Sequence, residues 1–306
     1  MGGGIGTPRL AYAVAAAGAL GMVGASDFDR ATLVEAFVNG KGRAAPGQHV
    51  GAGFLIPFVD RDAVAAVAPL VKVIEFFYGD PDPALVQLGH CGGALVSWQA
   101  GSAEEARAAA GAGCDFVIAQ GIEAGGHVRG KIGVLMLLDE VLGAVDVPVL
   151  AAGGVATARG MAAALAAGAD GVRVGTRFLL AEESSAHPDY RSAVIAARAS
   201  DTVLTGAFKV HWPDAPHRVL RASLEAASSR GGGASGASYP DEGAIPLFAP
   251  SPPSDKIGGP VDALAHYAGE SVSAATEVLP AAVIVRQIAD GAETLLRDRT
   301  RDLGVA

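Results

Sequence analysis

The stretch Val147-Pro-Val-Leu-Ala-Ala-Gly-Gly154 and the later stretch Gly168-Ala-Asp-Gly-Val-Arg-Val-Gly-Thr176 decide the fold. In each, a short apolar run without alternation ends in glycine, which is typical of a strand buried on both faces and followed by a tight turn. The Ala-rich segment Thr157–Ala167 between them is predicted to be a helix. Strands that alternate with helices predict a parallel sheet built from βα units.

The same alternation extends back to the N-terminus. The predicted strands are Leu20–Gly24, Val50–Leu55, Val71–Phe77, Ala94–Gln99, Phe116–Gln120, Val147–Ala151 and Gly171–Val174. The predicted helices are Thr7–Ala17, Asp27–Val38, Arg61–Leu70, Pro83–Leu88, Ala103–Gly111, Gly133–Ala144 and Thr157–Ala167. A closed TIM (β/α)₈ barrel needs eight strands. We therefore expect an α/β TIM barrel whose first strand, before Thr7, is missing or truncated, with an open doubly wound sheet as the alternative.

The N-terminal segment has two interpretations. Thr7 and Pro8 form a typical helix start, with a capping residue followed by proline at the first helical position. The apolar run Leu10–Ala25 after Arg9 also fits an export signal. We favour a helix followed by a strand.

After Phe178 the pattern changes, and three regions are predicted. Residues 1–182 form the barrel core, residues 183–271 an excursion over the barrel mouth, and residues 272–306 a helical segment packed on the barrel. Within the excursion the glycine- and serine-rich stretch Gly231–Ser238 is predicted to be flexible. The remaining predictions are a helix over Pro188–Ala199, a strand or extended loop over Thr202–Phe208, and one or two helices over Ala274–Arg297 with a break at Pro280.

Composition restricts the partners. The net charge of −9 gives no general attraction for nucleic acid, so a small-molecule substrate is expected. The two cysteines, Cys91 and Cys114, lack metal-site spacing and are interpreted as free thiols in a reducing compartment, so we expect a cytoplasmic protein without a metal. No apolar run is long enough for a membrane helix. The oligomeric state stays open, with a homodimer as one candidate.

The loops that follow the last two predicted strands are candidates for binding phosphate. In a βα barrel the active site lies at the carboxyl ends of the strands, and phosphate is usually bound at the last two loops. Glycine allows the backbone to approach a phosphate closely, and N–H groups at a helix start bind its oxygens. The candidate residues are Gly153, Gly154, Gly175 and Thr176. The alternative interpretation is that these glycines belong to ordinary turns that bind no phosphate.

His127 is the strongest catalytic candidate, because it follows Gly125 and Gly126 on a loop at the same end of the barrel. An imidazole can accept or donate a proton near neutral pH. Gln99 and Gln120 each end a predicted strand, where an amide can bind the carbonyl and N–H groups of a ring, or can simply cap the strand. Glu123 could orient His127 or stabilise the loop. His211 and His217 lie in the excursion and are weaker candidates for substrate contact.

Three segments together resemble the nitronate monooxygenase family: Val117-Ile-Ala-Gln-Gly-Ile-Glu-Ala-Gly-Gly-His127, Pro148–Gly154, and Gly168–Phe178. The stretch Asp214–Leu220 is also similar to it. The resemblance implies a TIM barrel that binds FMN, uses no metal and no NAD(P)H, and oxidises alkyl nitronates with O₂.

Residue by residue, the resemblance implies that His127 is the catalytic histidine and that Gln120, Gly125 and Gly126 lie beside the flavin. It places Ala152, Gly153, Gly175 and Thr176 in the flavin and phosphate loops, and Met1, Gly2 and Gly3 in an FMN-contacting loop. Two positions depart from the family. Gln99 stands where some members have lysine, and Gly53 stands where members often have asparagine.

Two other functions remain open. The FMN-dependent enoyl-acyl-carrier-protein reductases have much of the same loop sequence, but they need NAD(P)H. A non-redox barrel that binds a phosphorylated metabolite would also fit the loops. It would usually require a catalytic lysine or metal-binding carboxylates at the strand ends, and no convincing set is found.

Overall fold

The protein is built around a curled parallel sheet of seven strands. A computed structural model describes residues 3–41, 47–240 and 243–302. The strand order follows the chain, which excludes the doubly wound alternative because that fold reverses its order. The strands are β1 (Leu20–Gly24), β2 (His49–Leu55), β3 (Val73–Phe77), β4 (Leu95–Ala100), β5 (Phe116–Gln120), β7 (Val149–Ala152) and β8 (Gly171–Arg173). All seven predicted strands are confirmed. The strand expected before Thr7 has no counterpart among the described residues, and Met1 and Gly2 lie outside them.

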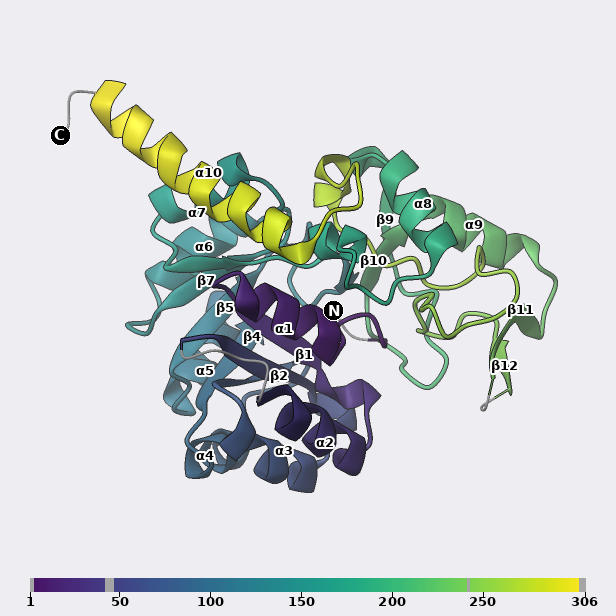
Figure 1. The fold of residues 1–306 in the computed structure, drawn as a ribbon, viewed down its shortest axis with the longest axis horizontal. Helices are drawn as coiled ribbons and strands as arrows, with labels where there is room; N and C mark the ends of the chain where they lie inside the picture. Colours follow the sequence, from purple (N-terminus) through teal and green to yellow (C-terminus); the bar gives the residue numbers. More distant parts are fainter. Residues whose placement is uncertain (1–2, 42–46, 241–242, 303–306) are drawn as a thin grey trace.

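Helices cover the outside of this curl, as in a TIM barrel (Figure 1). They are α1 (Pro8–Ala16), α2 (Arg30–Lys41), α3 (Arg61–Val67), α4 (Pro83–Cys91), α5 (Ala103–Gly111), α6 (Val134–Leu142) and α7 (Ala158–Ala166). Several begin at a capping side chain: the carboxylate of Asp82 accepts from Ala84 N, and the hydroxyls of Ser102 and Thr157 accept from Glu105 N and Gly160 N. Such caps supply partners for the free N–H groups of the first helical turn.

One predicted helix start and one predicted helix cap are wrong in detail. Helix α2 begins at Arg30 instead of Asp27, because Asp29 caps it by accepting from the backbone N of Thr32 at 3.0 Å. Residues Ala25–Asp27 form a separate 3₁₀ turn. Helix α1 begins at Pro8 as predicted, but the hydroxyl of Thr7 makes no capping hydrogen bond.

Strand alternation separates a core face from an inner face. Phe54, Phe76 and Trp98 are in register on β2, β3 and β4, and their rings meet at 5.1–6.2 Å in the core under the helices. Neighbouring residues on the same strands face the inside of the curl. Gln120, Ala152 and Arg173 are in register at the carboxyl ends of β5, β7 and β8. The fold thereby gathers side chains from distant parts of the sequence at one opening, the barrel mouth.

The chain after β8 adds a second layer at the barrel mouth. It contains α8 (Pro188–Ala196), β9 (Thr202–Thr205), β10 (His217–Leu220), α9 (Arg221–Ser229) and the hairpin β11 (Ala234–Tyr239) and β12 (Gly243–Pro246). Strand β10 lies between β9 and the short β6 (Gly126–His127), so this layer is joined to the His127 loop. The three predicted region boundaries stay a prediction.

The prediction of a flexible Gly231–Ser238 stretch is wrong. Most of it is strand β11, which pairs antiparallel with β12. Ser235 is fully buried, and its hydroxyl donates to the carbonyl of Ile245 at 2.8 Å. The pairing partner supplies a contact that the composition of the stretch alone does not reveal.

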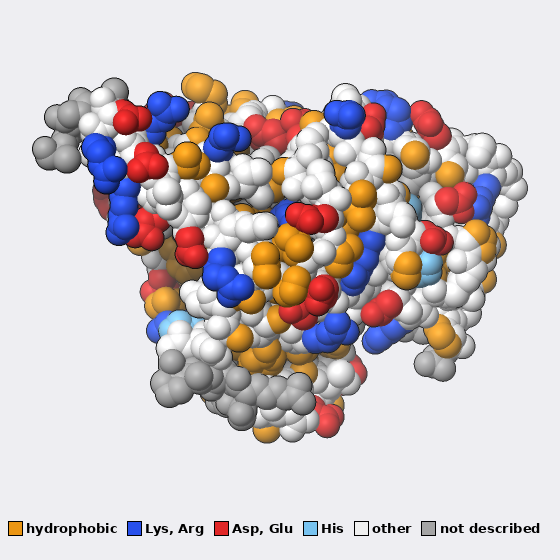
Figure 2. All heavy atoms as spheres, turned by 45° about the horizontal axis from the view of Figure 1, so that its top comes forward, with side chains coloured by type: hydrophobic (Ala, Val, Ile, Leu, Met, Phe, Trp, Pro, Cys, Tyr) orange, Lys and Arg blue, Asp and Glu red, His pale blue; other side chains and the backbone are white. Residues whose placement is uncertain are grey.

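The C-terminal helix α10 (Ala281–Asp302) begins directly after Pro280, which confirms the expected break. Its apolar residues Ile284, Val285 and Ile288 pack with Leu10 and Val14 of α1, beside the two edge strands β1 and β8. Acidic and basic side chains are interspersed on the face in Figure 2, including the projecting end of this helix. No helix in the described residues is long and apolar enough to cross a membrane.

One ion pair crosses the inside of the curl. Arg173 on edge strand β8 donates from Nε and Nη2 to the two carboxylate oxygens of Glu75 on β3, at 2.8 and 2.7 Å. Glu75 is 5% exposed. A charge-assisted fork of this kind fixes both side chains, and it connects the edge of the sheet to its opposite wall.

We predict that Glu75→Gln lowers the free energy of unfolding by roughly 2 kcal/mol, because it removes the charge-assisted hydrogen bonds that hold Arg173, whose side chain is 25% exposed, to the nearly buried Glu75. The exposed pair of Arg30 and Asp62 is the matched control, and Asp62→Asn should have a much smaller effect. Urea denaturation of the three proteins measures the difference. Equal losses for both variants would contradict the assignment of a stabilising role to the buried pair.

Candidate active site

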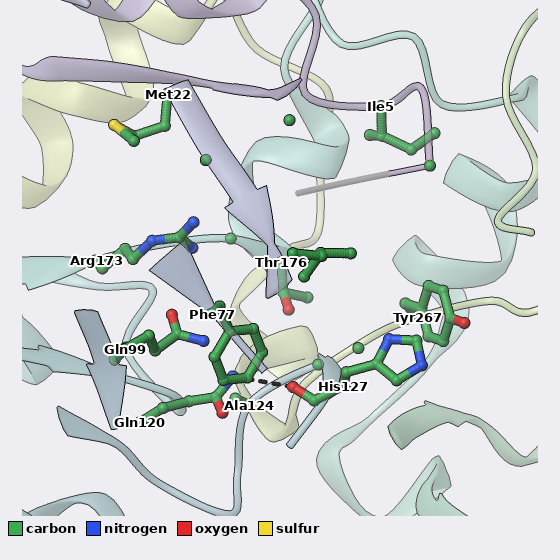
Figure 3. A pocket seen from close by; sticks show the side chains of 18 of the residues that line it. Ile5, Met22, Phe77, Gln99, Gln120, Ala124, His127, Arg173, Thr176 and Tyr267 are labelled. Carbon is green, nitrogen blue, oxygen red and sulfur yellow. Dashed lines mark hydrogen bonds between the residues drawn. The ribbon is translucent and has the colours of Figure 1, made fainter. Parts of the chain in front are cut away.

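A cavity of about 320 Å³ lies inside the curl at the carboxyl ends of the strands. Its volume falls within the roughly 300–1,000 Å³ of typical ligand sites. Every predicted site residue in the described chain lines it, whereas Met1 and Gly2 lie outside the described residues. These lining residues are Gly3, Gln99, Gln120, Gly125, Gly126, His127, Ala152, Gly153, Gly154, Gly175 and Thr176. The cavity thus brings together widely separated parts of the sequence (Figure 3).

The glycine loops are closely packed. Gly153 and Gly154 have φ angles of +96° and +70°, a region that favours glycine. A Cβ atom on Gly153 would lie 3.0 Å from the carbonyl oxygen of Gly121, and one on Gly125 would lie 2.3 Å from the backbone N of Gly269. These glycines are therefore required by backbone conformation and by close chain approach. They also leave the backbone uncovered toward the cavity.

Thr176 has a structural contact in addition to its place at the cavity. Its hydroxyl accepts a hydrogen bond from the backbone N of Gly269 at 3.0 Å, which joins the β8 loop to the second layer. A hydroxyl can still donate its own hydrogen when it accepts one bond. Thr176 can therefore hold the loop and contact a ligand at the same time.

Two buried amides face the cavity from neighbouring strands. Gln99 and Gln120 are 4% and 5% exposed. The Nε2 of Gln120 donates to the backbone carbonyl of His127 at 3.1 Å, and its Oε1 has no partner in the described chain. A buried acceptor without a partner is costly, so it marks a place where a ligand donor can bind.

His127 is held by aromatic rings on several sides. Its ring stacks on Trp212 at 3.8 Å with an interplanar angle of 24°. Tyr78 and Tyr267 contribute further ring contacts at 5.6 and 5.5 Å, and Figure 3 shows His127 turned toward Tyr267. The Nε2 of His127 is buried and has no hydrogen-bond partner in the described chain. It is a fixed imidazole with an unused polar atom.

The electrostatic environment keeps His127 neutral. Burial, followed by the neighbouring His217, lowers the pKa of His127 to about 3. The backbone strand pairing places these two histidines opposite each other, with ring centroids 5.2 Å apart. The imidazole is therefore unprotonated at neutral pH, which is the state that a proton acceptor needs.

The other polar candidates have structural roles. Both carboxylate oxygens of Glu123 accept from Val134 N at 3.0 Å at the start of α6, so Glu123 stabilises the loop and does not orient His127. His217 is fully buried, and its Nε2 accepts from Phe208 N. His211 does not line this cavity. No cluster of three or more His, Cys, Asp or Glu residues suited to a metal is found in the described part of the chain.

Several cavity residues were missed by the sequence analysis. Asp27 lines the cavity and accepts from Gly4 N at 3.1 Å, and burial raises its pKa despite that hydrogen bond. Glu75, Arg173, Trp212 and Tyr267 also line it. They come from elements separated by up to 240 residues in the chain. A polar residue inside a buried apolar strand, such as Glu75 or Arg173, was the one available signal.

Comparison with known proteins points to one family. The family model described as nitronate monooxygenase matches residues 45–289. A putative monooxygenase of Mycobacterium tuberculosis is 42% identical over 161 residues, covering 52% of this chain and 42% of that protein. A probable nitronate monooxygenase of Staphylococcus aureus is 31% identical over 249 residues, covering 66% of this chain and 69% of that protein. The chain spans less than half the length of the first two curated relatives that it matches.

Two solved structures resemble this one over nearly its whole length. FabK of Thermotoga maritima is 29% identical with a TM-score of 0.77, covering 97% of this chain and 93% of that one. Nitroalkane oxidase of Streptomyces ansochromogenes is 28% identical with a TM-score of 0.76, covering 96% and 94%. Both similarities include the strands and loops that form the cavity.

The buried histidines predict a loss of stability in acid. Burial lowers the pKa of His266 to about 4, as it does that of His127 to about 3. Unfolded histidines take up a proton near pH 6.5. The unfolded state therefore binds more protons than the folded state below that pH. The stability present above pH 6.5 should decrease as pH falls toward 4, by about 1.4 kcal/mol per pH unit for each histidine.

Urea denaturation at pH 7.5, 6.0 and 5.0 measures this slope. His266→Gln should reduce this slope by about 1.4 kcal/mol per pH unit, the contribution of one buried histidine. His49→Gln, on the exposed start of β2, should leave the slope unchanged. An unchanged slope in His266→Gln would contradict the interpretation.

Proposed function

Because the chain belongs to the nitronate monooxygenase family, we propose that it binds FMN and oxidises alkyl nitronates with O₂ to a carbonyl compound and nitrite. The family is flavin-dependent. The observation that carries the proposal is the state of His127. Its imidazole is neutral and is held between aromatic rings, and its unpartnered Nε2 belongs to a residue that lines the same cavity as the glycine loops.

The residues of the cavity fit a flavin mononucleotide. Gly153, Gly154 and Gly175 leave backbone exposed at the last two strand ends, where barrels usually bind phosphate. Thr176 adds a hydroxyl at the same place. Gln99 and the unpartnered Oε1 of Gln120 offer amide groups to a ring with both carbonyl and N–H groups.

A bound flavin would supply the electron acceptor for the reaction. The protein would bind and orient the substrate and would accept its proton. A nitronate is already a carbanion equivalent, so it needs binding and orientation beside His127 and no proton removal. A neutral nitroalkane must first lose its α-proton, and Nε2 of His127 can accept it. An anion formed beside the imidazole would raise its pKa during that step.

A second candidate function is supported by the FabK similarity. It is the FMN- and NAD(P)H-dependent reduction of an enoyl thioester bound to acyl carrier protein. The two functions differ in their electron donor. Oxygen consumption with ethyl nitronate and no pyridine nucleotide supports the first. NADH or NADPH oxidation that requires an enoyl thioester, with no nitronate activity, would replace it with the second.

The first prediction here tests the cofactor site. Gly154→Val should weaken FMN binding by roughly tenfold or more, equivalent to at least 1.4 kcal/mol, because a side chain would separate the ligand from the backbone. Gly232→Val is the matched control: its φ of +60° imposes similar strain, but it lies in the β11–β12 region away from the cavity. FMN titration of both proteins provides the measurement. Equal affinities would argue against this loop as the flavin site.

The second prediction tests His127. His127→Asn should reduce oxidation of neutral nitroalkanes by roughly 10² to 10⁴-fold, the usual contribution of a general base. Preformed nitronates should be affected much less, because their α-proton is already absent. Oxygen consumption with each substrate form gives both rates, and the exposed His49→Asn serves as control. Equal losses on both forms would mean that His127 binds the nitro group and does not remove a proton.

The same structure predicts the pH dependence. The pKa of His127 in the ligand-free protein is about 3, so this residue should not titrate near pH 6.5. The dependence of kcat/KM on pH for preformed nitronate should therefore have the same shape in wild type and in His127→Asn. An inflection near pH 6.5 that is present in wild type and absent from the variant would contradict this prediction.

A further inference from the structure

A second cavity lies next to the first and shares a wall with it. It is a partly open pocket with a volume of about 360 Å³, and it is lined by the hairpin β11–β12, the loop 210–212 and residues 249–251. Phe58, Trp212 and Pro250 line both cavities. The second cavity is thus separated from the candidate active site by a few side chains.

Trp212 is the central part of this wall. Its ring stacks on that of His127 with centroids 3.8 Å apart, and it meets the rings of Phe58 and Tyr78 in T-shaped contacts with centroids 5.0 and 4.9 Å away. It is 8% exposed. Moving this ring would uncover one face of the catalytic imidazole and connect the two cavities in the same motion.

The backbone around Trp212 is strained. His211 and Asp214, which flank Trp212 and Pro213, have φ angles of +63° and +56°. Residues other than glycine adopt this region at a cost, and such positions cluster at functional sites. The stacked position of Trp212 therefore lies in a strained loop, whose backbone cost is offset by the contacts of the tryptophan ring.

The second cavity has an apolar lining. Val210, Ile245 and Ala249 provide aliphatic surface, and prolines at 246 and 250 add to it. His211 and Tyr239 are the titratable residues among the described lining, which contains no Lys, Arg, Asp or Glu. Such a surface favours an uncharged hydrocarbon over a phosphate or a carboxylate.

We infer that this second cavity binds the alkyl chain of the substrate whose reacting end lies beside His127, and that Trp212 determines access to it. The inference rests on the proposed function. It specifies the substrate as an unbranched alkyl nitronate whose chain is longer than that of the smallest alkyl nitronates. A chain lying past Trp212 would gain apolar contact with each methylene added.

The test is a series of n-alkyl nitronates from two to eight carbons. In the holoenzyme kcat/KM should rise about fourfold per methylene once the chain reaches the second cavity, until that cavity is filled. Ala244→Phe, on the exposed surface of β12 that lines the cavity, should abolish the rise and leave two-carbon turnover unchanged. Ala108→Phe on the exposed face of α5 is the matched control. A flat series in wild type, or an equal rise in Ala244→Phe, would overturn the inference.

A binding experiment separates this inference from the proposed function. The chain has two tryptophans, so Trp98→Phe leaves Trp212 as the sole reporter. In that holoenzyme 1-octanol should change the Trp212 emission at concentrations at least tenfold below those needed for 1-butanol, and Ala244→Phe should remove this difference. If no nitronate reacts but this difference is found, the proposed function fails and the alkyl site stands. If neither alcohol affects Trp212 specifically, the alkyl site is overturned.

Discussion

The buried ion pair between Glu75 and Arg173 is the contact on which the shape of the cavity depends. A parallel sheet of seven strands curls but leaves β1 and β8 as edges in the described chain, so β8 needs another attachment. Arg173 supplies it by reaching across to β3. Glu75 is almost fully buried and the Arg173 side chain is 25% exposed toward the cavity, so the attraction is less screened than between two surface charges, and Glu75 would lose solvation without its partner if Arg173 were removed. The pair therefore behaves as a unit.

This attachment also sets the chemistry around it. Arg173 shares its register row with Ala152 and Gln120, and the Gln120 amide holds the backbone of His127. The position of the catalytic candidate is thus linked to the ion pair through two neighbouring strands. The second layer contributes from the other side, because β10 pairs with the His127 strand and brings His217 opposite it. His127 is fixed where barrel and second layer meet.

Much of the barrel could be predicted because its signals are local. Strands such as Leu20–Gly24 and Phe116–Gln120 are short apolar runs between turn residues, and their bounds in the structure match the prediction. Gly153 and Gly154 could be placed because only glycine readily adopts their backbone conformation. Strand β11 could not be predicted, since its glycine- and serine-rich sequence becomes a strand only by pairing with β12. Trp212 and Tyr267 could not be placed at the cavity, because their contacts with His127 span 85 and 140 residues of chain.

The local rules of protein structure are broken most often around the cavity, and the breaks have a common cause. Tyr78, an aromatic residue, has a φ of +65° and contacts both His127 and Trp212. Five buried side-chain polar atoms have no partner in the described chain. Three of them, the Oε1 of Gln120, the Nε2 of His127 and the hydroxyl of Tyr267, belong to residues that line the cavity, and the other two belong to Thr7 and Ser97. Each such feature costs stability, and the helix-covered core of Phe54, Phe76 and Trp98 shows none of them. A sequence selected only for stability would fill these positions with satisfied or apolar groups. Their concentration on one surface indicates that the surface is completed by a ligand, whose polar groups and apolar bulk satisfy what the chain leaves open.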